Sequence, residues 1–65
     1  MVELRRLRNY LGLTQREVER ATGVSIGRLS AAENGKRVLV GVELRAVQEF
    51  YKARLQILRE MKVAN

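Results

Sequence analysis

Residues 14–35, TQREVERATGVSIGRLSAAENG, decide the fold of this 65-residue chain, because they predict two short helices and the turn between them. Thr14 and Glu17 have the spacing of a capping box, in which each side chain accepts a hydrogen bond from the other residue's backbone amide. Leu13 and Val18 occupy the two positions of a hydrophobic staple, which fixes the direction in which the chain enters the helix. The first helix of the pair is therefore expected to start directly after Thr14.

The turn between the two helices is specified by Gly23 and Ser25. Gly23 can adopt the left-handed backbone that commonly ends a helix, and Ser25 is a good N-cap for the next one. Val24 and Leu29 repeat the staple around Ser25, so a second helix is expected over residues 26–33. A Gly-apolar-Ser turn between helices this short favours a helix-turn-helix hairpin, which projects one helix toward DNA, over two capped helices of an ordinary bundle.

Three groups of residues in this region carry a family resemblance: Gly12, Leu13, Thr14 and Gln15; Gly23, Val24 and Ser25; and Leu29, Ser30, Glu33, Asn34 and Gly35. On these residues the sequence resembles the phage Cro and C1-type repressor (XRE) family of helix-turn-helix DNA-binding proteins, over about residues 3 to 50. The resemblance implies an all-α fold, a small helical bundle of the lambda repressor-like type. Residues 1–65 would then form a single domain with the helix-turn-helix at 15–34.

Three residues depart from the family pattern. Glu19 stands where most relatives carry Ala, Thr22 where many carry Leu, and Ala32 where a larger apolar residue is usual. We therefore expect the two helices to cross less tightly than the pattern implies.

The composition argues against an enzyme or a metalloprotein. The chain has no Cys and no His, which removes thiolate metal ligands, the commonest zinc ligand and the commonest general base. We expect no catalytic residue, no bound metal, no cofactor and no small-molecule ligand. The N-terminus does not resemble a signal peptide, and no apolar run approaches about 20 residues. We therefore expect a cytoplasmic protein that does not enter a membrane, and the resemblance places it in a bacterial cell or a phage-infected host.

The charge indicates a polyanionic partner. Thirteen Lys and Arg residues against seven Asp and Glu residues give a net charge of +6. Such an excess can serve solubility alone, but together with a helix-turn-helix it favours double-stranded DNA.

Outside the hairpin, the sequence predicts further helices joined by an extended connection. Leu residues at helical spacing predict a first helix over residues 2–11, and residues 36–41, KRVLVG, suit an extended connection. Its three apolar residues either close the core or face a partner: Val38, Leu39 and Val40. Residues 42–65 contain no Gly or Pro and are rich in helix formers, which predicts one long helix, or two short ones if the chain bends near its middle.

The resemblance gives tasks to residues in and around the hairpin. Five residues of the second helix, the recognition helix, would face base edges: Ile26, Gly27, Arg28, Ser30 and Ala31. Arg28 alone has the fork geometry for guanine, whereas Ile26, unless it is a core residue, and Ala31 suit thymine methyl groups. Five other residues would contact phosphates: Gln15, Arg16, Ser25, Lys36 and Arg37.

A structural ion pair is also implied by the resemblance. In relatives, an Arg at the place of Arg8 and the Glu before Asn-Gly, here Glu33, tie the first helix to the recognition helix. A buried charge without its partner is strongly destabilising, so a pair is expected rather than two solvated side chains.

The C-terminal helical region, residues 42–62, carries more apolar residues than the domain's own core needs. Leu44, Val47 and Phe50 are expected to close the core over the hairpin. Three residues further along extend past it and predict a homodimer interface: Leu55, Leu58 and Met61. A dimer would set two recognition helices about one turn of DNA apart, roughly 34 Å. The alternative is that the last two turns fold back onto the same core.

The leading functional hypothesis is a sequence-specific transcriptional regulator, a Cro-like repressor that occupies a palindromic operator and acts by steric occlusion. An antitoxin that represses its own operon would share the domain and would respond to a partner toxin. A protein-interaction module that has kept the fold would not bind DNA. A basic helix that lies on a membrane is a weaker alternative, because three acidic residues interrupt the C-terminal helix: Glu43, Glu49 and Glu60.

Overall fold

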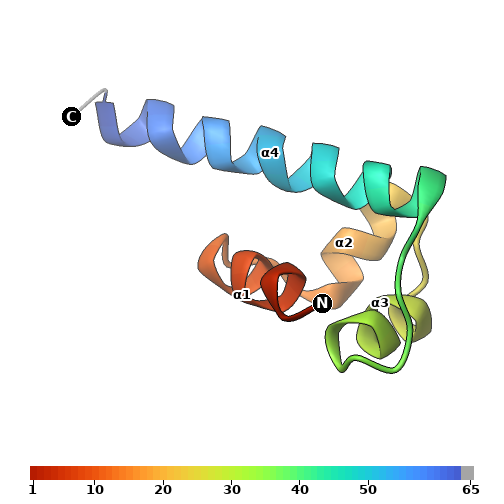
Figure 1. Cartoon of the computed structure of the whole chain (residues 1–65). Helices are drawn as coiled ribbons and strands as arrows, with labels where there is room; N and C mark the ends of the chain where they lie inside the picture. Colours follow the sequence, from red (N-terminus) through yellow and green to blue (C-terminus); the bar gives the residue numbers. More distant parts are fainter. Residues whose placement is uncertain (64–65) are drawn as a thin grey trace.

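The structure is all-α, as the sequence predicts. The computed structural model describes residues 1–63 and contains four helices over this range: α1 (Val2–Tyr10), α2 (Gln15–Thr22), α3 (Ile26–Glu33) and α4 (Gly41–Val63) (Figure 1). Helices α2 and α3 form the helix-turn-helix hairpin. None of the helices in residues 1–63 combines the length and the apolar character that crossing a membrane requires.

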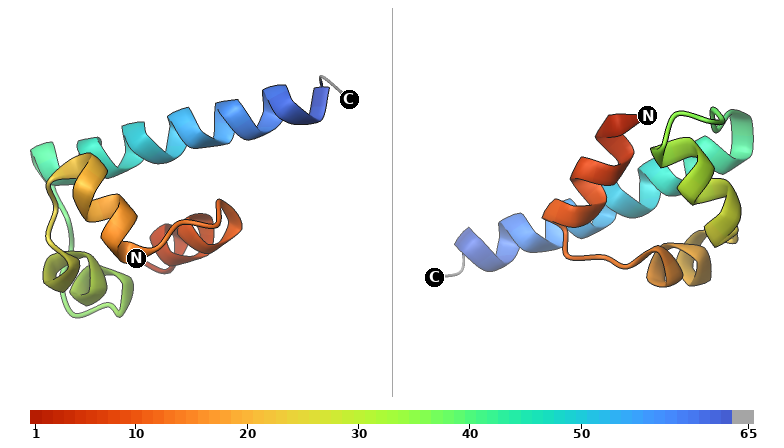
Figure 2. Two further views of the ribbon diagram at one scale, coloured as in Figure 1. Left: turned by 180° about the vertical axis from the view of Figure 1, so that it is seen from behind. Right: turned by 90° about the horizontal axis from the view of Figure 1, so that it is seen from below.

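Helix α4 gives the molecule its elongated shape. It lies across the three shorter helices, and its C-terminal turns extend beyond α1 (Figures 1 and 2). The molecule measures 40 × 19 × 18 Å as a result. Because α4 is one continuous helix from Gly41 to Val63, neither a division into two short helices nor a fold-back of the last two turns occurs.

The local signals around the hairpin are confirmed. The Thr14 hydroxyl accepts a hydrogen bond from the Glu17 backbone amide at 3.0 Å, and the Glu17 carboxylate accepts one from the Thr14 amide at 3.1 Å. Gly23 ends α2 with φ +79°, a left-handed conformation that glycine adopts without steric cost. Ser25 then caps α3, because its hydroxyl accepts a hydrogen bond from the Arg28 amide at 3.2 Å.

Two residues that depart from the family pattern tie the turn together with hydrogen bonds. The Glu19 carboxylate accepts a bond from the Ile26 backbone amide at 3.1 Å, so a side chain of α2 satisfies a free amide at the start of α3. The Thr22 hydroxyl donates to the Val18 carbonyl at 2.7 Å and accepts from the Val24 amide at 3.1 Å. These bonds fix the geometry of the turn beyond what its glycine and N-cap specify.

The core draws on all four helices and on both connections that flank the hairpin. Its buried apolar residues are Leu4, Leu13, Val18, Val24, Leu29, Ala32, Leu39, Val47 and Tyr51. In the extended connection, Leu39 closes the core, whereas Val38 and Val40 are exposed. In α4, Val47 is buried as expected, while Leu44 and Phe50 pack against the core with part of their surface exposed.

Arg8 and Glu33 form an ion pair that joins α1 to α3. Arg8 Nε donates to Glu33 Oε2 at 2.7 Å and Arg8 Nη2 donates to Glu33 Oε1 at 2.9 Å, which is the bidentate arrangement of two parallel bonds. Arg8 Nη1 also donates to the Leu13 carbonyl at 2.9 Å, and the side-chain Nε2 of Gln15 donates to Glu33 Oε1 at 3.2 Å. The Glu33 side chain is 2% exposed and that of Arg8 is 13% exposed, so the pair lies largely out of water.

The environment of the pair sets the charge of both partners. Burial by itself raises the pKa of Glu33, but the hydrogen bonds from Arg8 and Gln15 outweigh it and leave that pKa below its usual value. The hydrogen bond to Glu33 correspondingly raises the pKa of Arg8. Both residues are therefore charged at neutral pH.

Tyr51 brings a buried hydroxyl close to this pair. Among the described residues, the Tyr51 hydroxyl is the buried polar side-chain group that has no hydrogen-bond partner. Burial, assisted by the nearby charge of Glu33, raises the pKa of Tyr51 to about 12, so its hydroxyl is neutral at physiological pH.

We predict that Arg8→Met removes most of the stability of the fold. The change leaves a buried carboxylate without its cation, which typically costs about 3 to 5 kcal/mol. A domain of this size has only about 3 to 10 kcal/mol of unfolding free energy. Urea unfolding followed by circular dichroism measures the loss. Arg6→Met, at an exposed position of the same helix, is the matched control and should change stability by less than about 0.5 kcal/mol. Equal losses in the two variants would show that the pair has no special role.

A second prediction concerns Glu19. Glu19→Ala should lower the free energy of unfolding by about 1 kcal/mol, because the Ile26 amide loses its acceptor and the N-terminus of α3 loses a nearby negative charge. Glu19→Gln keeps an acceptor oxygen and should lose less. The control is Glu49→Ala, at an exposed position of α4. A Gln variant as destabilised as the Ala variant would show that the charge, and not the hydrogen bond, matters.

Candidate nucleic-acid interface

Helix α3 has one buried face and one outward face. Leu29, Ala32 and Glu33 are buried, and with 3.6 residues per turn the opposite side carries the small or polar residues Gly27, Ser30, Ala31 and Asn34. Gly27 and Asn34 are exposed, and Ser30 and Ala31 are partly exposed. The side-chain Nδ2 of Asn34 donates to the Ser30 hydroxyl at 3.4 Å. Since no long side chain stands on this face, another surface could approach the backbone of α3 closely.

Ile26 lies at the N-terminal end of the same helix and is half-buried. It is therefore neither the fully exposed residue nor the core residue that the sequence left as alternatives. Its backbone is held by Glu19, so its position relative to α2 is well defined.

Arg28 lies at the flank of α3 and turns toward α4. Its Nη1 atom donates to Glu43 Oε2 at 2.5 Å, and Glu43 belongs to the first turn of α4. The Arg28 side chain is 54% exposed and that of Glu43 is 28% exposed, so solvent reaches the pair. Nothing in the sequence indicated this contact, because Glu43 is 15 residues away and belongs to a separate helix.

The residues assigned to phosphates lie around both ends of α3. Ser25 is the N-cap of α3, so its hydroxyl lies beside the free amides at that end. Near the C-terminal end of α3, the Gln15 side chain donates to Glu33, and the Lys36 backbone amide donates to the Ala31 carbonyl at 2.9 Å. The structure therefore brings the start of α2 and the connection after α3 to the same end of α3.

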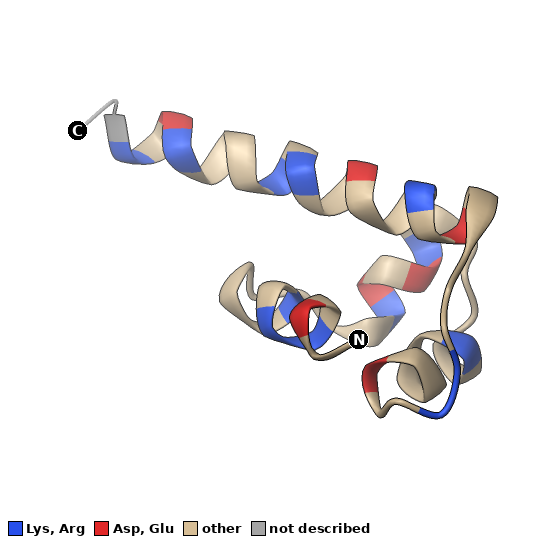
Figure 3. Cartoon of the chain, in the orientation of Figure 1, with Lys and Arg blue, Asp and Glu red and all other residues tan. Residues whose placement is uncertain are grey.

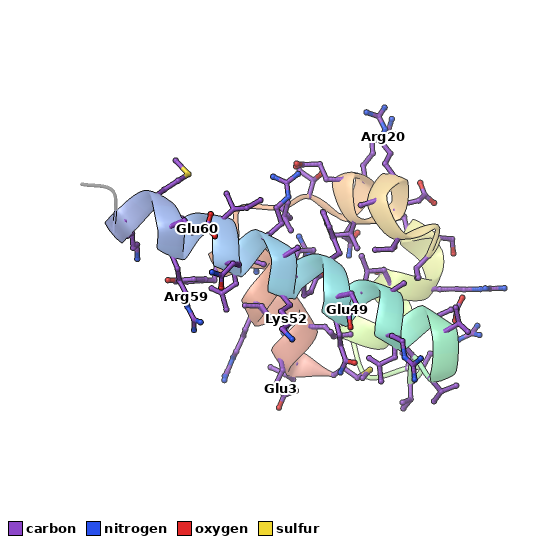
Figure 4. The ribbon with its side chains drawn as sticks, turned by 90° about the horizontal axis from the view of Figure 1, so that it is seen from above. Glu3, Arg20, Glu49, Lys52, Arg59 and Glu60 are labelled. Atoms are coloured by element: carbon purple, nitrogen blue, oxygen red, sulfur yellow. The ribbon has the colours of Figure 1, made fainter. Side chains whose placement is uncertain are left out.

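Three exposed cations near that end have no acidic partner among residues 1–63: Arg16, Lys36 and Arg37. Lys and Arg residues are visible on α2, on α3 and on the connection that follows α3 (Figure 3). Basic residues elsewhere are mixed with acidic ones. Along α4, for example, Lys52 and Arg59 point into solvent, as do Glu49 and Glu60 (Figure 4). The hairpin end of the molecule thus combines the small outward face of α3 with three exposed cations near the C-terminal end of that helix.

The part of the chain that the structure describes contains no cluster of His, Cys, Asp or Glu that could hold a metal ion. Two residues at this surface were not assigned to it from the sequence. Glu43 binds Arg28, and Asn34 shares the outward face of α3. Helical spacing from Gly27 could have indicated the second of these, but no sequence signal could have indicated the first.

Comparison with known proteins agrees with this geometry. A family model described as a helix-turn-helix domain matches residues 2–60, nearly the whole chain. No curated protein and no solved structure matched the chain. The match extends from α1 through most of α4 and so includes the hairpin and the helices that pack against it. The chain therefore belongs to the helix-turn-helix domain family.

Proposed function

We propose that this protein is a sequence-specific, double-stranded DNA-binding transcriptional regulator. It would act as a Cro-like repressor that occupies a palindromic operator and excludes other proteins from it. The observation that carries the proposal is the small outward face of α3, together with nearby cations at one end of the helix that have no acidic partner among the described residues. A groove-binding helix requires both an accessible face and positive charge at its margins.

In this proposal, α3 lies in the major groove. Gly27 and Ser30 allow the backbone to approach the bases, while Ile26 and Ala31 contact thymine methyl groups. Arg28 has the geometry to bind guanine O6 and N7, and it would have to leave Glu43 to do so. With one such residue on α3, direct base readout by one copy of the chain is sparse.

Phosphate contacts would hold the helix in place. Arg16 and the free backbone amides at the start of α2 would contact phosphates near the C-terminal end of α3, and so would Lys36 and Arg37 in the connection that follows. Gln15 is a weaker candidate than the sequence alone implies, because one of its two amide hydrogens is already donated to Glu33. Ser25 could contribute through the N-terminus that it caps.

We further propose a homodimer formed through the end of α4. Leu55 and Leu58 are partly exposed, while Ile57 is 50% and Met61 62% exposed. A hollow of about 140 Å³ lies beneath the last turns of α4 and is lined by Leu11, Arg54, Ile57, Leu58 and Met61. A second copy would cover this apolar surface and supply a second α3 for the other half of a palindrome.

DNA binding is tested by its dependence on salt. The logarithm of the binding constant for a duplex should fall linearly with the logarithm of salt concentration between about 50 and 200 mM. Arg37→Ala should reduce the slope by about 0.9 for each copy of the chain, with weaker binding to specific and unrelated duplexes alike. Fluorescence anisotropy with labelled duplexes measures both quantities. Lys52→Ala, on the side of α4 away from α3, is the matched loss of charge and should leave the slope unchanged (Figure 4). A wild-type chain that binds no duplex at low salt would support an interaction module in place of a DNA-binding protein.

The dimer is tested by sedimentation equilibrium across the micromolar range. Leu58→Glu should convert a dimeric wild type to a monomer, because it places a charge in the apolar surface of α4. Val40→Glu is the control, since it adds the same charge at an exposed apolar residue of the extended connection. If Val40→Glu dissociates the dimer and Leu58→Glu does not, the interface lies at the extended connection. A wild type that stays monomeric both free and on DNA would contradict the dimer.

A further inference from the structure

We infer that α1 takes part in DNA binding, through a contact between Arg5 and a backbone phosphate beside the C-terminal end of α3. This inference rests on the proposed function and extends its phosphate contacts to a helix outside the hairpin. The cations already assigned to this end of α3 belong to α2 and to the connection after α3. Arg5 adds one from a third element of the fold.

The first turns of α1 lie against the C-terminal end of α3. The amino group of Met1, the N-cap of α1, donates to the Ala32 carbonyl at 3.1 Å. Two turns later, Arg8 binds Glu33 through two parallel hydrogen bonds. With 3.6 residues per turn, residues 1, 5 and 8 fall within about 60° of one another around the helix axis. Arg5 therefore lies between the two groups of α1 that bind α3, on the same flank of the helix.

The Arg5 side chain is close to Glu33 but does not bind it. Burial works to raise the pKa of Glu33, its hydrogen bonds lower it, and the charges of Arg8 and Arg5 lower it further. Glu33 already accepts hydrogen bonds from Arg8 and Gln15. Arg5 is exposed, and its side chain makes no hydrogen bond or ion pair within residues 1–63. It therefore presents an uncommitted guanidinium to solvent beside the end of α3.

The gathering of cations at this end of α3 favours a polyanion as the partner. Arg5 joins three cations that likewise have no acidic partner in the described part of the chain: Arg16, Lys36 and Arg37. Like charges held close together repel one another, and a row of phosphates relieves that repulsion. These cations also offset the negative end of the α3 dipole, which by itself opposes a phosphate there. Offsetting the dipole stabilises the fold without DNA as well, and the experiment separates the two roles.

The experiment compares Arg5→Ala with Arg6→Ala on the full chain. Arg6 is also exposed but lies about 100° further around α1, away from the flank that follows α3. Fluorescence anisotropy measures binding to a duplex between about 50 and 200 mM salt, and urea unfolding measures stability. Arg5→Ala should reduce the salt slope by about 0.9 for each copy of the chain and weaken binding about two- to fivefold, whatever the sequence of the duplex. Arg5→Lys keeps the charge and should retain the slope. Arg6→Ala should leave the slope unchanged, and the two Ala variants should unfold at similar urea concentrations.

Three results would overturn the contact and leave the proposed function to the separate test with Arg37→Ala. Equal losses of slope in Arg5→Ala and Arg6→Ala would show a general effect of charge. A loss in Arg5→Lys as large as that in Arg5→Ala would exclude a phosphate, which accepts either cation. An Arg5→Ala chain that keeps the wild-type slope would give Arg5 at most a structural role, which a lower urea midpoint would reveal. A wild type that binds no duplex at low salt would overturn both the contact and the proposed function.

Discussion

The buried ion pair between Arg8 and Glu33 is the interaction on which the arrangement of the hairpin depends. Glu33 is the last residue of α3, and it binds Arg8 of α1 and Gln15, the first residue of α2. Arg8 in turn binds the Leu13 carbonyl in the loop before α2. Taking two charges out of water is costly, so the pair is tolerated only because its hydrogen bonds are nearly all made. A bidentate pair also has a single good geometry. It therefore fixes the position of the recognition helix relative to the rest of the domain more sharply than apolar contacts of the same area could.

The features that the sequence predicted are those that nearby residues determine. The capping box at Thr14, the left-handed Gly23 and the N-cap Ser25 depend on neighbours within a few positions, and the bounds of α3 follow from them. The long fourth helix could be expected because no Gly or Pro interrupts it after Gly41. The resemblance implied the pair between Arg8 and Glu33, but the residues alone did not distinguish it from two solvated side chains.

The features that the sequence missed depend on how separate helices approach one another. The contact of Arg28 with Glu43 requires the beginning of α4 to lie beside α3, which is set by the path of the extended connection. Gln15 illustrates the same limit, because its bond to Glu33 exists only once α2 and α3 have packed. The assignments to bases, phosphates and a second copy remain predictions, since they concern surfaces that face outside the chain.

The uninterrupted α4 also has a mechanical consequence. A helix of 23 residues is about 34 Å long and bends little without a Gly, a Pro or a bulge. Its first half is clamped to the core by Val47 and Tyr51, so the whole helix moves as a rigid arm of the domain. In the dimer proposed above, the angle and the position at which two such arms cross would fix the separation of its two halves. The spacing of the operator that such a protein prefers could then be altered by repacking residues that never come near DNA.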